Sequence, residues 1–61
     1  MSFKTMRKRA GMTQMQVANA LGVTNAAVSQ WETGKTMPKG ESLLKLAKIF
    51  GCTVDELLEE E

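Results

Sequence analysis

The polar side chains between residues 24 and 33 are suited to recognising a surface and poorly suited to catalysis. Asn25, Ser29 and Gln30 carry amide and hydroxyl groups, which donate and accept hydrogen bonds but do not titrate near neutral pH. The sequence contains no histidine, so its one cysteine, Cys52, has no imidazole for a thiol catalytic pair or a zinc site. A chain of 61 residues is also too short to enclose a substrate pocket. We therefore expect a binding protein and not an enzyme, with no cofactor and no metal.

The composition predicts one small helical domain over residues 1–61. The residues are 43% apolar and 25% charged, with a single proline, which is typical of a folded globular chain. Cys52 cannot form an internal disulfide, so stability must come from well-capped, closely packed helices and association with a second copy. No apolar run approaches the roughly 20 residues needed to span a bilayer. The first residues lack the pattern of a secretory signal, and we expect a cytoplasmic protein.

The net charge of +1 conceals an uneven distribution. Residues 1–39 contain six Lys or Arg side chains and one acidic side chain, whereas residues 40–61 contain two Lys and six acidic side chains. A polyanion would therefore be attracted to the first part of the chain and repelled by the second. The same asymmetry would also arise if charged faces simply kept a small domain in solution.

Glycine and threonine positions divide the sequence into five helices. Gly11, Gly22, Gly34 and Gly51 follow segments with helical periodicity, where a left-handed residue commonly ends a helix. Thr13, Thr24 and Thr53 then stand where a hydroxyl can cap the next helix, and Gly40 is the expected cap of the fourth. These signals predict an all-α fold with helices at 2–10, 14–21, 25–33, 41–50 and 54–59, and the loop at 33–40 as the one extended connection.

Apolar side chains recur at helical spacing and define the expected core. We assign Val28 and Trp31 to it because their spacing places both on the inner face of the third helix. The remaining expected core residues are Phe3, Met6, Ala10, Val17, Ala18, Leu21, Leu43, Leu46, Ala47 and Phe50.

Residues 13–33 form the most specific pattern in the chain. Two short helices are joined by a turn of about three residues that contains Gly22, as in a helix-turn-helix. Because Val28 and Trp31 point inward, the opposite face of the second motif helix presents four residues that could read a surface: Asn25, Ala26, Ser29 and Gln30.

These features resemble the Cro/C1-type, lambda-repressor-like helix-turn-helix family, also called XRE-type regulators. The resemblance covers almost the whole chain, and its matching segments are 13–14, 17–18, 21–24, 28–32, 34–35, Pro38, 43–48 and 51–58. It implies a compact five-helix domain that binds double-stranded DNA sequence-specifically. It further implies a dimeric repressor of phage or mobile-element type that occludes a promoter. Two reading helices about 34 Å apart would then meet a pseudo-palindromic operator.

The resemblance also implies roles for individual residues. Asn25, Ala26, Ser29 and Gln30 correspond to base-reading positions, and an amide side chain there can pair with the N6 and N7 edge of adenine. Gln14, Thr24, Lys35 and Thr36 correspond to phosphate-contacting positions. Arg7 and Glu32 are expected to form a buried ion pair, and contacts between two copies are expected around Cys52, Val54 and Leu58.

Three other interpretations fit the same residues. Asn25, Ser29, Gln30 and Lys35 would also suit solvated helix and loop positions. The fold could bind a protein partner, as an antitoxin or an adaptor does, with no DNA involved. The chain could also be the DNA-binding domain excised from a longer repressor, in which case residues 59–61 would begin a linker.

Overall fold

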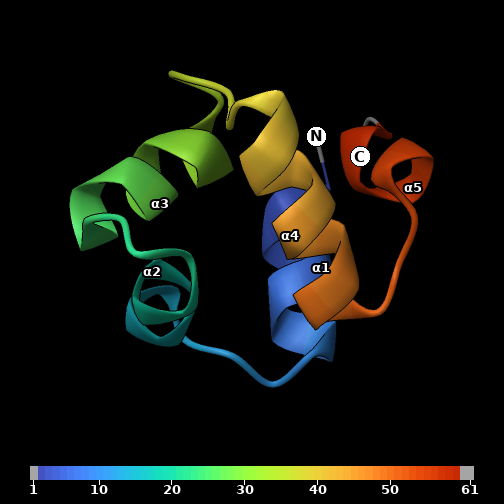
Figure 1. The fold of residues 1–61 in the computed structure, drawn as a ribbon, viewed down its shortest axis with the longest axis horizontal. Coiled ribbons are helices and arrows are strands. Elements are labelled where there is room, and N and C mark those ends of the chain that lie inside the picture. Colours follow the sequence, from blue (N-terminus) through green and yellow to red (C-terminus); the bar gives the residue numbers. More distant parts are fainter. Residues whose placement is uncertain (1, 60–61) are drawn as a thin grey trace.

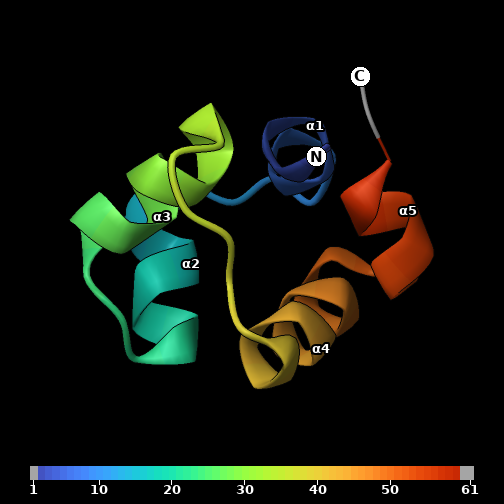
Figure 2. The same cartoon turned by 90° about the horizontal axis from the view of Figure 1, so that it is seen from above.

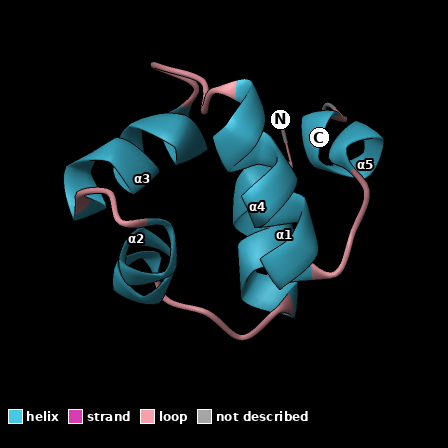
Figure 3. Cartoon of the chain, viewed as in Figure 1, coloured by secondary structure: helices cyan, strands magenta, loops and turns pink. Residues whose placement is uncertain are grey.

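The computed structural model describes residues 2–59, and every regular element within this range is an α-helix (Figure 3). The sequence-based prediction of an all-α fold with five helices is confirmed, with end points shifted by one residue in three of the helices. In chain order the helices are α1 (Phe3–Arg9), α2 (Gln14–Leu21), α3 (Asn25–Thr33), α4 (Gly40–Phe50) and α5 (Val54–Leu58). The acidic residues 60 and 61, which we considered as the start of a linker, lie outside the described residues.

Three helices begin at the predicted threonine caps. The hydroxyl oxygens of Thr13, Thr24 and Thr53 each accept a hydrogen bond from the backbone N–H three residues later. At Thr13 and Thr53 the side chain of the third residue, Gln16 or Glu56, also accepts from the backbone N–H of the threonine. These reciprocal bonds satisfy N–H groups that a helix start leaves unpaired.

The start of α4 differs from the prediction. Lys39 and not Gly40 occupies the N-cap position, with extended backbone angles and no side-chain cap bond, and Gly40 is the first residue of the helix. A lysine side chain carries no acceptor for the free N–H groups. This helix therefore depends on its tertiary packing, which buries Leu46, Ala47 and Phe50.

The core lies where α1, α3 and α4 meet. The Phe3 ring packs edge-on against Trp31 and Phe50, with ring centroids 6.1 Å and 5.4 Å apart. Around this trio lie the other buried side chains of the cluster: Val17, Ala18, Val28, Leu46 and Leu57. The predicted core is thus largely correct, with Met6, Leu21 and Leu43 partly buried. The assignment of Ala10 was wrong: it caps the end of α1 and is exposed.

The helices are arranged so that α1 and α4 lie between the α2–α3 pair and α5 (Figures 1 and 2). This arrangement places α3 on one side of the domain and α5 on the other, with the shared core between them. Within residues 2–59, no helix has the length and apolarity that crossing a membrane requires.

Candidate nucleic-acid interface

Helices α2 and α3 form a rigid pair joined by a tight turn. Gly22 ends α2 in the left-handed region, at φ 71°, a conformation that a side chain would strain. The next N–H, of Val23, donates to the carbonyl of Ala18 at 3.0 Å. Ala18 and Val28 are buried where the two helices pack. The turn and this contact together fix the angle at which α3 leaves α2.

The outer face of α3 is free while its inner face is held in the core. Val28 is fully buried and Trp31 is 7% exposed. Asn25, Ala26 and Gln30, on the other side, are exposed. Three of the four residues predicted to read DNA bases are thus exposed on one side of α3, and Ser29 is half-buried.

Backbone hydrogen bonds hold the loop after α3 against the end of that helix. The backbone N–H groups of Lys35 and Thr36 both donate to the carbonyl of Gln30, at 3.0 Å and 3.4 Å. Pro38, further along, is buried. The side chains of Lys35 and Thr36 are exposed, so a cation and a hydroxyl are held beside the C-terminal end of α3.

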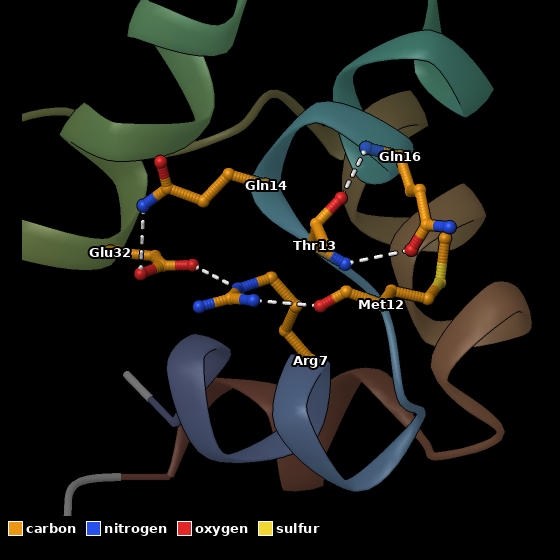
Figure 4. A network of polar contacts seen from close by, with 6 residues as sticks. All are labelled: Arg7, Met12, Thr13, Gln14, Gln16 and Glu32. Atoms are coloured by element: carbon orange, nitrogen blue, oxygen red, sulfur yellow. Dashed lines mark hydrogen bonds and ion pairs between the residues drawn. The ribbon is translucent and has the colours of Figure 1, made fainter.

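An ion pair between α1 and α3 anchors this surface to the rest of the domain. Arg7 Nε donates to Glu32 Oε2, and Arg7 Nη1 donates to the carbonyl of Met12 at 2.7 Å (Figure 4). The side chains of Arg7 and Glu32 are only 12% and 6% exposed. The predicted pairing of Arg7 with Glu32 is thus present, and the pair is largely buried.

Gln14 completes the network in a way that the sequence reasoning missed. Its amide Nε2 donates to Glu32 Oε1 at 3.1 Å, so the two carboxylate oxygens bind α1 and α2 separately (Figure 4). The signal was present in the sequence: one arginine cannot satisfy all the acceptor positions of a buried carboxylate. No buried side-chain nitrogen or oxygen within residues 2–59 is left without a partner.

The bond to Glu32 changes what Gln14 can offer to an anion. The bond to Glu32 uses one of the two Nε2 hydrogens, so the other remains as a donor. The backbone N–H groups of Gln14 and Met15 are also available, because they lie in the first turn of α2, where a helix has no carbonyl to accept from them. Thr24 keeps a donor as well, because its oxygen accepts from the Ala27 N–H while its hydroxyl hydrogen stays available. Thr24 is exposed.

The residues expected to contact a second copy lie across the domain from α3. Cys52 and Val54 are half-buried and Leu58 is 38% exposed. Cys52 also borders a hollow of about 390 Å³ beside α4, where Leu44 is 64% exposed. Burial raises the pKa of the Cys52 thiol, with the Glu56 carboxylate adding to the effect. Among the described residues, no three His, Cys, Asp or Glu side chains gather as a metal site requires.

Comparison with known proteins identifies the family. The model of the family described as Helix-turn-helix matches residues 3–57 of the chain. The chain belongs to this family. Its matching relatives include the HTH-type transcriptional activator BcrR of Enterococcus faecalis, which is 45% identical over 56 residues. Repressor protein C2 of Salmonella phage P22 is 41% identical over 56 residues.

The helix-turn-helix chain is shorter than these relatives. Each match covers 92% of this chain but only 28% of the activator and 26% of the repressor, so the chain spans about a quarter of their length. A solved structure is similar over nearly the whole chain: the P22 c2 repressor protein in complex with the synthetic operator 9T. That structure has a TM-score of 0.85 and 39% identity, with 97% of this chain and 89% of the repressor chain covered. The lambda-repressor-like architecture predicted from the sequence is thereby confirmed.

Proposed function

We propose that this chain is a sequence-specific double-stranded DNA-binding domain of a transcriptional regulator, acting as a dimeric repressor that occludes a promoter. The observation that carries the proposal is the outer face of α3, where Asn25, Ala26 and Gln30 stand exposed on a helix whose opposite side is buried. The similarity to a repressor solved with its operator supports it.

The α3 face has the chemistry that base reading requires. The major groove of B-form DNA admits one α-helix and presents donors and acceptors that differ for each base pair. Amide side chains such as those of Asn25 and Gln30 can pair with both N6 and N7 of adenine, the Ala26 methyl can contact a thymine methyl, and the Ser29 hydroxyl can serve either role. Because α3 is held by Val28 and Trp31, these groups enter the groove in a fixed register.

The groups flanking α3 would hold the DNA backbone. The N–H groups at the start of α2 and the partial positive charge of that helix end favour a phosphate. The hydroxyl of Thr24 lies before α3, and Lys35 and Thr36 lie after it. Gln14 would contribute its backbone N–H and the second hydrogen of its amide, while the first amide hydrogen binds Glu32.

A second copy would bind on the α5 side, around Cys52, Val54 and Leu58. Helix α5 lies on the opposite side of the domain from α3 (Figure 1), so the acidic residues of α5 would lie away from the phosphates, and the two α3 helices of a dimer would meet one face of the duplex. Such a dimer reads two half-sites about 34 Å apart, one turn of DNA.

A salt titration of duplex binding tests the proposal through Lys35. Neutralising several phosphates makes the logarithm of the binding constant fall steeply with the logarithm of the salt concentration. Lys35→Ala should weaken binding to every duplex and reduce this slope by about one unit. Lys4→Ala, which removes an exposed lysine from α1, serves as the control and should change the slope less. Absence of binding even at low salt would reject the function and direct the search to a protein partner.

A further inference from the structure

Ser2 connects the beginning of the described chain to its last helix. Its hydroxyl donates to the carbonyl of Glu56 at 2.7 Å and to that of Leu57 at 3.2 Å. Its backbone N–H donates to the same Leu57 carbonyl at 3.0 Å. Ser2 is 6% exposed. The single hydroxyl hydrogen, shared between two carbonyls, and the backbone N–H therefore both reach the end of a helix more than fifty positions away.

This serine behaves unlike the three threonines that precede helices. The hydroxyls of Thr13, Thr24 and Thr53 accept from their own helices, and their backbones are extended, with ψ between 156° and 164°. Ser2 precedes α1 with ψ at 32°, and its side chain makes no cap bond to that helix. The hydroxyl that would normally stabilise the start of α1 is used on α5 instead.

Helix α5 needs these donors because few N–H groups of its own C-terminal end bind its last carbonyls. The helix has five residues, and the residue after it, Glu59, is extended with φ −60° and ψ 143°. Glycines in the left-handed region end α2, α3 and α4 and return N–H groups to the last carbonyls. At the end of α5 the Glu59 N–H donates to the Glu56 carbonyl, and Ser2 supplies the other donors.

We propose that Ser2 is a clamp that holds α5 on the domain, and that α5 opens as a separate unit when the clamp is lost while α1 to α4 stay folded. Leu57 is the one buried side chain within α5, and Val54 is half-buried, so the helix has few other attachments. The clamp makes the docking of the last helix depend on the segment around Ser2. If the second copy binds around Val54 and Leu58, which rests on the proposed function, the clamp also controls that surface.

Amide hydrogen exchange of Ser2→Ala tests the clamp without any DNA. Protection of the α5 amides, such as those of Leu57 and Leu58, should fall about tenfold or more, because the carbonyls of Glu56 and Leu57 lose the Ser2 hydroxyl and each keep only one backbone N–H donor. Protection in α2 and α3 should fall clearly less. Ser42→Ala is the matched control, since Ser42 is a half-buried serine of α4, and it should leave the ratio between α5 and α3 protection unchanged. An equal loss at all helices, or no loss at α5, would overturn the proposal.

The unaltered protein provides a second test that does not depend on a variant folding. In low denaturant its α5 amides should exchange with a weaker dependence on denaturant concentration than those of α3, because a local opening exposes less surface than global unfolding. Identical dependence at α5 and α3 would show that α5 opens only with the whole domain, contrary to the clamp. Neither measurement involves DNA, so failure of the DNA-binding proposal would leave the result intact.

Discussion

Glu32→Ala should destabilise the domain by about 3–5 kcal/mol, because it leaves the Arg7 guanidinium buried without its counter-charge. It also removes the acceptor of the Gln14 amide, so contacts from α3 to both α1 and α2 are lost together. The free energy of unfolding of small proteins is about 0.05–0.15 kcal/mol per residue, which gives roughly 3–9 kcal/mol for a domain of 61 residues. The variant should therefore melt far below the parent protein or be unfolded, as measured by thermal circular dichroism.

Glu41→Ala is the matched control for this prediction. Glu41 forms an ion pair with Lys45 at 3.5 Å, but the two side chains are 83% and 56% exposed. A solvated pair four residues apart on a helix contributes only about 0.3–0.5 kcal/mol. The double variant Glu32→Leu with Arg7→Met serves as a second comparison. It should recover much of the stability that Glu32→Ala loses, because it removes both charges. If Glu32→Ala melts within a degree or two of the parent, the network does not hold the helices together.

Gln30→Ala should weaken binding to the preferred operator by about 1–3 kcal/mol, or roughly 5- to 150-fold in Kd. The reason is the loss of a side chain that can bond two atoms of one base edge. Binding to random duplex should change little, since phosphate contacts supply that affinity. The measurement is the Kd on preferred and random duplexes at one salt concentration.

Comparison with Lys35→Ala distinguishes base-reading residues from phosphate-contacting residues. The lysine variant should lower affinity on both duplexes by a similar factor. Asn19→Ala, which removes an exposed amide from α2 outside the proposed reading face, should leave the preference for the operator unchanged. Should Gln30→Ala and Lys35→Ala act alike on preferred and random DNA, the division between base-reading and phosphate-contacting residues is wrong.

Local signals in the sequence accounted for most of the fold. The threonine caps and the glycines at helix ends act within a few residues of their own positions, which is why Thr13, Thr53 and Gly22 were correctly interpreted. The start of α4 was misjudged because Lys39 supplies no side-chain signal and only packing fixes the helix there. Ala10 was misplaced because its apolar spacing continued the helical pattern one residue past its end.

The contacts that the sequence did not predict join residues far apart in the chain. Gln14 lies 18 positions from Glu32, and Ser2 lies 54 positions from Glu56. Their residue types suggest ordinary local roles, a helix-start residue and an N-cap, and only the packing of helices brings the true partners together. The exposed face of α3 followed from spacing alone, because Val28 and Trp31 decide which side of that helix is buried.

Selection of bound duplexes from a random DNA pool at moderate salt tests the central claim most directly. Sequencing of the retained fraction should reveal an enriched inverted repeat whose half-sites lie one helical turn apart, as two α3 helices of a dimer require. A single enriched half-site would keep the reading helix but reject the dimer. Failure to enrich any sequence would contradict the proposal that the α3 face reads DNA bases.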